Sequence, residues 1–174
     1  MVQQLQDLKY FVYDTAVGDV TLVATNRSLK ALLLGAKDPL GCRNEENVTL
    51  LDAIVELNQY FFGIRQQFTI PLEPIGNAQE LLVFKEVEKI PYGHTSTYKQ
   101  VGDAIGKDEA FVEETLLKNH LPLFIPCHRV LKSENDHGNY VFGPLLKDKL
   151  LSMEKEKNRN KKMFRPGHYL NPKA

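Results

Sequence analysis

The chain has 174 residues, of which 43% are hydrophobic and 25% charged, and its 22 basic and 22 acidic residues give a formal net charge of zero. This composition is typical of one large or two small globular domains and excludes wholesale disorder. No apolar run approaches the roughly 20 residues that cross a bilayer, and the polar start lacks the apolar segment of a secretory signal. We therefore expect a soluble, intracellular protein without a membrane partner.

The first part of the chain, residues 1–75, has the pattern of a small α/β domain. Apolar residues at helical spacing from Leu51 to Phe61 predict a helix that Gly63 ends, and Phe68–Ile70 reads as one more strand. Pro71–Asn77, with two prolines and a glycine, predicts a linker. Before the helix, three short β-branched or apolar runs separated by turns predict a strand meander: Tyr10–Tyr13, Asp19–Ala24 and Leu29–Leu34.

The second part, residues 76–174, is predicted to be a helical domain. Thr95 or Ser96 would cap its second helix, and residues 106–108 would turn into the third, which together give a helix-turn-helix. Helical spacing predicts four helices in all: Ala78–Lys89, about Thr97–Ile105, about Glu109–Leu117 and Leu145 to about Lys157.

The tetrapeptide Pro126-Cys127-His128-Arg129 places a cysteine beside a histidine at the end of the apolar run 121–125. A thiol attacks as its thiolate, and at a reference pKa of about 8.5 only a few per cent is ionised at neutral pH. A nearby histidine, base or water relay can change that fraction. An unpaired cysteine among apolar residues is more often a small buried hydrophobe without chemistry. Cys42, the other cysteine, lies in a polar loop, and we interpret both as free thiols because intracellular thiols are usually reduced.

Short motifs elsewhere in the second half support a functional cysteine. Residues 81–155 closely resemble the catalytic half of the O6-alkylguanine-DNA alkyltransferases, also called methylated-DNA–protein-cysteine methyltransferases. Residues 15–18 and 20–35 resemble the opening hairpin of the family's first domain. The resemblance implies an α/β (α+β) fold: a small ribonuclease-H-like N-terminal domain, then a helical winged helix-turn-helix catalytic domain. The motifs that carry it are, in chain order, Ile90-Pro91-Tyr92-Gly93, Thr95, Tyr98, Gly106, Asn119, Pro122, the Pro-Cys-His-Arg segment, Gly138-Asn139-Tyr140 and Glu154.

The resemblance also implies a reaction, in which the protein moves the alkyl group of O6-alkylguanine in double-stranded DNA onto its own cysteine and is consumed. Cys127 would be the acceptor, His128 would take its proton through a water, and Glu154 would orient and polarise that histidine. Tyr98 matches the tyrosine that donates to the ring of the flipped base. No cofactor is implied. Some family members hold a structural zinc in the first domain, but no histidine precedes His94 here, so we expect no metal.

Further residues are expected to contact the substrate or the DNA, or to support those that do. By the resemblance, Asn119 ties the recognition helix to the active-site strand, and Arg129 braces that strand. Val141 and Phe142 replace the small residues usual in the family, so we expect a narrow pocket that accepts methyl and takes bulky groups such as benzyl poorly. The full set is Asn119, Arg129, Phe111, Tyr140, Val141, Phe142 and Lys147.

The predicted recognition helix, residues 109–118, departs from the family, in which an arginine fills the gap left by the flipped base. The helix is about two residues shorter than usual, and the corresponding position falls among Ala110, Phe111 and Val112, none of which is basic. Its three glutamates and one lysine would also weaken binding to phosphates. Two interpretations of Phe111 stay open: an apolar wedge in the minor groove, or a core residue.

Seven basic residues follow Ser152 against two acidic ones, which leaves 15 basic and 20 acidic residues before it. This basic tail is a candidate phosphate-binding arm, or a solvated terminus without a partner. Two alternatives to the repair protein also stay open: a protein that binds alkylated DNA without transferring the group, and a protein-interaction module with a vestigial cysteine. We expect a monomer, in the nucleus of a eukaryote or the cytoplasm of a prokaryote.

Overall fold

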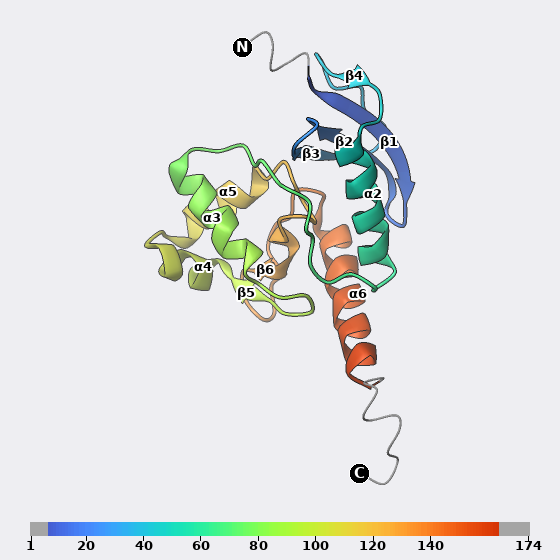
Figure 1. Ribbon diagram of the computed structural model, residues 1–174. Helices are drawn as coiled ribbons and strands as arrows, with labels where there is room; N and C mark the ends of the chain where they lie inside the picture. The colour runs from blue at the N-terminus through green and yellow to red at the C-terminus, as the bar shows by residue number, and fades with distance from the viewer. Residues whose placement is uncertain (1–6, 164–174) are drawn as a thin grey trace.

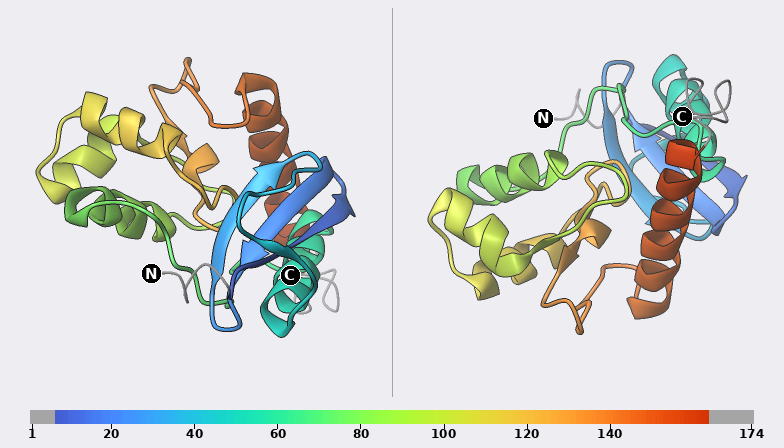
Figure 2. Two further views of the ribbon diagram at one scale, coloured as in Figure 1. Left: turned by 90° about the horizontal axis from the view of Figure 1, so that it is seen from above. Right: turned by 90° about the horizontal axis from the view of Figure 1, so that it is seen from below.

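The computed structural model describes residues 7–163, and their side chains as far as Arg159. Its elements are β1 (Lys9–Thr15), β2 (Gly18–Ala24), β3 (Leu29–Leu34), β4 (Arg43–Asn44), α2 (Val48–Phe61), α3 (Ala78–Glu88), β5 (Ser96–Thr97), α4 (Tyr98–Ile105), α5 (Glu109–Leu117), a 3-10 turn (Cys127–Arg129), β6 (Val130–Leu131) and α6 (Pro144–Met163). Figure 1 shows two groups: the sheet and α2 lie on the right, and the cluster of α3, α4 and α5 lies on the left. α6 lies beside α2. The views from above and below in Figure 2 show the same two groups. No helix within residues 7–163 is long and apolar enough to cross a membrane.

The first four strands form one sheet in the order β3-β2-β1-β4. β1, β2 and β3 pair antiparallel, which confirms the predicted meander. β4 was not predicted, and it pairs parallel with β1 through two residues at the sheet edge. Val20, Leu22 and Ala24 of β2 are fully buried, so the central strand supplies the apolar layer on which the helix packs.

Helix α2 begins at Val48, three residues before the predicted start. The side chain of Asn47 accepts a hydrogen bond from the backbone N–H of Leu50 at 2.8 Å, which caps the first turn. Leu50, Leu57 and Tyr60 expose at most 1% of their surface and recur at helical spacing. The face of α2 that they form therefore belongs to the core.

The strand predicted at residues 68–70 is wrong. The N–H groups of Thr69 and Ile70 donate to Oε2 of Glu56 at 2.9 and 3.3 Å, and the Thr69 hydroxyl donates to Oε1. A carboxylate from α2 thus takes the place of a neighbouring strand as the partner of this backbone. β3 pairs with the chain just after this segment, at the isolated bridge between Leu29 and Leu72.

The helix-turn-helix is formed by α4 and α5, and its second helix has the predicted bounds. The first helix starts one residue later than predicted and is capped by neither Thr95 nor Ser96. Instead, Oγ1 of Thr97 accepts from the N–H of Gln100 at 3.1 Å, and Oε1 of Gln100 accepts from the N–H of Thr97 at 3.0 Å. This reciprocal pair is a capping box, in which Thr97 is the N-cap residue and Gln100 the third residue of the helix.

The segment around the cysteine is a 3-10 turn rather than the expected strand. β6 follows it and pairs parallel with β5 through two residues on each side. Helix α6 extends to Met163, six residues beyond the predicted end. Among the described side chains of α6, those of Lys147, Leu150 and Glu154 are buried and recur at helical spacing, so α6 directs a lysine and a glutamate into the interior.

Candidate active site

Cys127 lies in the 3-10 turn with 3% of its surface exposed. Its Sγ accepts a hydrogen bond from Nδ2 of Asn119 at 3.3 Å. Burial raises the pKa of the thiol to about 11, although the Asn119 bond and the charge of Lys147 act in the opposite direction. Because this pKa lies far above neutrality, the resting side chain is a thiol, and attack requires a base that takes its proton.

Asn119 stands two residues after the end of α5 and is buried. Its Oδ1 accepts from the N–H of Leu121 at 2.9 Å, and its Nδ2 donates to the carbonyl of Ile125 at 3.2 Å as well as to the thiol. The amide therefore ties the end of α5 to the turn that carries Cys127, where a strand was expected.

His128 and Glu154 form a buried pair in which neither residue exposes more than 1% of its surface. Nε2 of the imidazole is hydrogen-bonded to Oε2 of the carboxylate, whereas Nδ1 has no partner among the described protein atoms. An ionised carboxylate only accepts, so Nε2 carries the hydrogen and Nδ1 keeps a lone pair. Burial lowers the pKa of His128, which leaves the ring neutral and able to accept a proton.

Glu154 is held ionised by the groups that donate to its two oxygens. Nε of Arg129 donates to Oε1 at 2.7 Å, and the N–H of Gly93 donates to the same oxygen at 3.2 Å. Burial alone would raise the pKa of Glu154, but the hydrogen bonds from His128 and Arg129 and the charge of Arg129 outweigh it and bring the pKa to about 2. Glycine is required at position 93, because φ is +79° and a Cβ would lie 2.5 Å from the Asn158 side chain.

Tyr60 belongs to this network, although it is not among the site residues expected from the sequence. Its hydroxyl donates to Oε2 of Glu154 at 2.6 Å and lies 3.5 Å from Nε2 of His128. Burial and the charge of Glu154 raise the pKa of Tyr60, so the phenol stays a donor. Helical spacing placed this residue on the buried face of its helix, and a buried phenol usually finds a partner. The partner, 94 residues further along the chain, left no signal in the sequence.

Tyr98 and Lys147 converge on one backbone carbonyl. The Tyr98 hydroxyl donates to the carbonyl of Asn139 at 3.2 Å, and Nζ of Lys147 donates to it at 2.9 Å and to the carbonyl of Val130 at 2.7 Å. Gly138 makes room for the phenol, because a Cβ there would lie 2.6 Å from the Tyr98 hydroxyl. Lys147 is fully buried, which lowers its pKa to about 8. Its ammonium therefore holds two carbonyls and exposes no surface to a phosphate.

A hollow too narrow to hold a water molecule adjoins Cys127. Val141 lines this hollow, whereas Phe142 packs against the ring of Tyr140 with the centroids 5.8 Å apart. The hydroxyl of Tyr140 is buried and has no hydrogen-bond partner among the described residues. Sites for small molecules usually measure about 300–1,000 Å³, so a purine enters only when the wall moves. The wall consists of Tyr98, Glu113, Leu116, Leu117, Cys127, Asn139, Tyr140 and Val141.

The three positions considered for the missing arginine differ in exposure. Ala110 is exposed, Phe111 is half-buried and Val112 is fully buried, so Val112 cannot enter a DNA duplex. Nζ of Lys107 lies 5.3 Å from the centroid of the Phe111 ring, at a distance typical of a cation–π contact. Phe111 is thus partly a core residue, and its use as a wedge stays a prediction.

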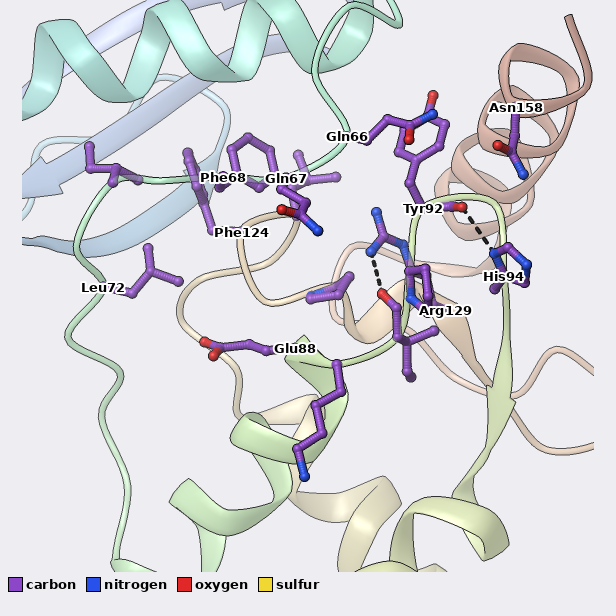
Figure 3. Close-up of a pocket in the computed structure, with 16 residues that line it drawn as sticks. Gln66, Gln67, Phe68, Leu72, Glu88, Tyr92, His94, Phe124, Arg129 and Asn158 are labelled. Atoms are coloured by element: carbon purple, nitrogen blue, oxygen red, sulfur yellow. Dashed lines mark hydrogen bonds between the residues drawn. The ribbon is translucent and has the colours of Figure 1, made fainter. Parts of the chain in front are cut away.

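Arg129 lines a larger cavity of about 800 Å³ (Figure 3), and Cys127 does not line it. Nη1 of Arg129 donates to the carbonyl of Ile90 at 2.8 Å, so Glu154 and this carbonyl already engage the guanidinium. Within the described residues, no three His, Cys, Asp or Glu side chains are placed to hold a metal ion. The residues labelled around this cavity include Phe68, Tyr92, His94, Phe124 and Asn158.

The basic tail is described only in part. Lys155 and Arg159 are exposed on α6, and the Lys157 side chain passes so close to Gly63 that a Cβ there would lie 2.6 Å from it. The phosphate-binding arm stays a prediction, because its other members lie outside the described side chains: Lys161, Lys162, Arg165 and Lys173.

Two family descriptions match adjacent parts of the chain. Residues 8–74 match the 6-O-methylguanine DNA methyltransferase, ribonuclease-like domain. Residues 79–156 match the 6-O-methylguanine DNA methyltransferase, DNA binding domain. The first match covers the sheet with α2, and the second covers the helix-turn-helix and the turn with Cys127, which confirms the predicted fold class.

Named relatives and solved structures agree with these matches. The methylated-DNA–protein-cysteine methyltransferase of Metallosphaera sedula is 35% identical over 151 residues, which cover 84% of this chain and 93% of that protein. The protein of the same name from Saccharolobus solfataricus is 33% identical and covers 84% and 95%. The crystal structure of Mycobacterium tuberculosis OGT in complex with DNA has a TM-score of 0.79 at 28% identity and covers 86% and 94%. The chain therefore belongs to the 6-O-methylguanine DNA methyltransferase family.

Proposed function

We propose that this family member transfers the alkyl group of O6-alkylguanine in double-stranded DNA to Sγ of Cys127 and is consumed by the reaction. A bond between sulfur and the alkyl carbon forms as the bond between that carbon and O6 breaks, and the electron pair of the broken bond stays with the purine. The thiol proton passes to His128 and is returned to the purine, which leaves as guanine. The resulting thioether has no free thiol, so each protein molecule acts once.

The observation that carries this proposal is the state of His128. Ionised Glu154 fixes the hydrogen on Nε2, and the free lone pair on Nδ1 belongs to the residue directly after the cysteine. A neutral imidazole with a held tautomer offers a free lone pair that can take the proton of the buried thiol. Tyr60 and Arg129 support the base indirectly, because both donate to the carboxylate that orients it.

Double-stranded DNA is the partner that the helix-turn-helix family domain supports. The O6 atom of a paired guanine lies inside the duplex, so the base must leave the stack, at a cost of a few kcal/mol. Tyr98 lines the hollow with a neutral hydroxyl, and we assign it the donor to the ring of the flipped base. We place the protein in the compartment that holds the genome, which is the nucleus in a eukaryote and the cytoplasm in a prokaryote.

The hollow also supports a preference for small alkyl groups. Val141 lines it beside Cys127, and Phe142 backs the ring of Tyr140, so the branched and aromatic side chains of this loop narrow the space. We expect methyl to be transferred and benzyl to be transferred poorly. Efficient labelling of Cys127 by a benzylguanine probe would contradict this preference.

The deciding experiment is an intact-mass measurement. The pure protein is incubated with a duplex that carries one O6-methylguanine, alongside Cys127→Ser and Cys42→Ser. We expect a gain of one methylene unit, about 14 Da, in the wild type and in Cys42→Ser but not in Cys127→Ser. No gain in a folded protein that is in excess over DNA would reject alkyl transfer and leave lesion binding without chemistry, or a protein-interaction module, as the function.

A further inference from the structure

One hydrogen bond joins the recognition helix to the loop beside Cys127. Oε1 of Glu113, on α5, accepts from Nδ2 of Asn139 at 2.8 Å, across 26 residues of sequence. Within residues 7–159, no other hydrogen bond is recorded between α5 and the loop 132–143. The backbone of Asn139 is already fixed, because its carbonyl accepts from Tyr98 and from Lys147. This Glu113–Asn139 bridge therefore connects a side chain on α5 to a loop residue whose backbone carbonyl is already held by two hydrogen bonds.

Both ends of the Glu113–Asn139 bridge line the hollow that contains Cys127. Glu113 also faces the phenol of that hollow: after burial, its charge is the next cause that raises the pKa of Tyr98 to about 12. The hollow is smaller than sites that hold small molecules, so its wall has to move before a purine can reach the thiol. Among the described residues, the bridge is the one hydrogen bond that has to break before α5 and the loop can separate.

We propose that Glu113 determines access to the acceptor site: its bond to Asn139 holds the hollow closed over Cys127 in the free protein, and a base enters after this bond opens. The inference rests on the proposed role of Cys127. Only molecules in the open state can react with small reagents or free bases. The observed rate therefore equals the rate of the open state multiplied by the fraction of molecules that are open. A duplex opens the site with binding energy that a free base does not have. Glu113 is unfavourable for phosphate contact, but it would limit the alkyl transfer to bases that are presented in DNA.

The test measures how fast iodoacetamide modifies Cys127 in the free protein, in a Cys42→Ser background that leaves one thiol. Glu113→Ala removes the bond and should raise the second-order rate constant about tenfold, which is the shift in an opening equilibrium expected from one charge-assisted hydrogen bond of about 1.4 kcal/mol. Glu113→Gln keeps an acceptor oxygen and should restore most of the protection. Glu114→Ala removes the same charge from an exposed position of the same helix and should leave the rate unchanged.

The other end of the bridge gives an independent measurement. Asn139→Ala should raise the iodoacetamide rate as much as Glu113→Ala, because each variant removes the same bond. The double variant should react no faster than either single variant, since the two side chains act as one unit. Equal rates in wild type and Glu113→Ala, or additive effects in the double variant, would overturn the proposal.

This readout needs no methyl transfer, so it separates the inference from the proposed function. If the duplex assay shows no mass gain but Glu113→Ala accelerates modification, the closure stands and the transfer reaction falls. If transfer occurs, a second comparison uses free O6-methylguanine as the substrate. Glu113→Ala should then raise transfer from the free base about tenfold, and an unchanged rate would overturn the role of the bridge in substrate access.

Discussion

The acceptor centre, formed by Cys127, His128, Arg129, Lys147 and Glu154, and the recognition helix α5 are neighbours. They differ in whether their charged side chains are buried and paired. Around Cys127 the charged groups are buried and each is paired: Glu154 with Arg129 and His128, and Lys147 with two carbonyls. On α5, Glu109 and Glu114 are exposed, and within residues 7–159 their carboxylates accept no hydrogen bond. The two regions meet at Asn119 and at the Glu113–Asn139 bridge.

This difference predicts how well each region tolerates the loss of one charged side chain. A buried ion pair that loses one member leaves an uncompensated charge, so the acceptor centre depends on every partner. Exposed charges are screened by salt and act through small, nearly additive terms, so the affinity of α5 for DNA can change step by step. We therefore expect single substitutions to abolish transfer in the centre and only to tune it on the helix.

Glu154→Gln should have the largest effect. The amide cannot hold the imidazole in the same way, and general-base assistance is typically worth about 10²–10⁴-fold in rate. Loss of the buried charge also leaves Arg129 unpaired, which should lower the free energy of unfolding by about 3 kcal/mol. Single-turnover methyl transfer and urea unfolding measure the two effects. Glu156→Gln, at an exposed position on α6, is the matched control and should change neither. A folded Glu154→Gln protein with the wild-type rate would remove Glu154 from the relay.

The pH dependence of thiol modification tests whether the centre is as buried in solution as in the structure. Burial raises the pKa of Cys127 to about 11, above the value of about 8.5 expected in the unfolded chain. The thiolate fraction, and the iodoacetamide rate, should therefore rise about 100-fold between pH 7 and 9 without a plateau. Lys147, with a pKa of about 8, loses charge in this range and should make the rise slightly shallower.

The same shift has a consequence for stability. The folded state holds the thiol proton more tightly than the unfolded state, so this contribution is complete below pH 8.5 and is lost as the pH rises towards 11. The free energy of unfolding should decrease over that interval in wild type and decrease less in Cys127→Ala. A plateau of the modification rate near pH 8 would show that the thiol is activated already in the free protein.

Tyr60→Phe should have a smaller effect, because it removes one donor to Glu154 and leaves the others in place. We expect methyl transfer to slow about three- to tenfold and the free energy of unfolding to fall by about 1–2 kcal/mol. Tyr13→Phe is the control, since its hydroxyl also donates to a glutamate, Glu46, but at an exposed position. A wild-type transfer rate in a destabilised Tyr60→Phe protein would assign the hydroxyl a structural role alone.

Local patterns were sufficient for most of the fold. The period of apolar residues predicts the meander and the helices, because each element buries one face and that face repeats at the period of the element. The prediction at residues 68–70 was wrong because the N–H groups of Thr69 and Ile70 bond to the Glu56 side chain. Strand propensity cannot identify the acceptor of a backbone N–H group when that acceptor is a carboxylate on another element.

The placement of Cys127, His128 and Glu154 could be expected from neighbouring positions and a known motif order, and their catalytic roles stay predictions. Contacts made by one side chain that reaches across the fold could not be expected. Tyr60 and Glu154 are 94 residues apart, and Glu113 and Asn139 are 26 apart, and each contact depends on how whole helices pack. Lys147 was expected at the substrate or the DNA, but its place on the inner face of α6 directs the ammonium to backbone carbonyls.

The smallest effect is expected from the exposed charges of the recognition helix. Removing both by Glu109→Gln and Glu114→Gln should raise duplex affinity about two- to fivefold at low salt, because unscreened carboxylates near phosphates oppose binding. The gain should shrink as salt approaches about 1 M, where the Debye length is about 3 Å. Fluorescence anisotropy of a labelled duplex over a salt series measures both quantities. Asp52→Asn, which removes an exposed charge from α2, is the control and should leave affinity unchanged. Equal affinities for the double variant and the wild type at low salt would mean that α5 does not face the phosphates, and the contrast between the two regions would then have no bearing on DNA binding.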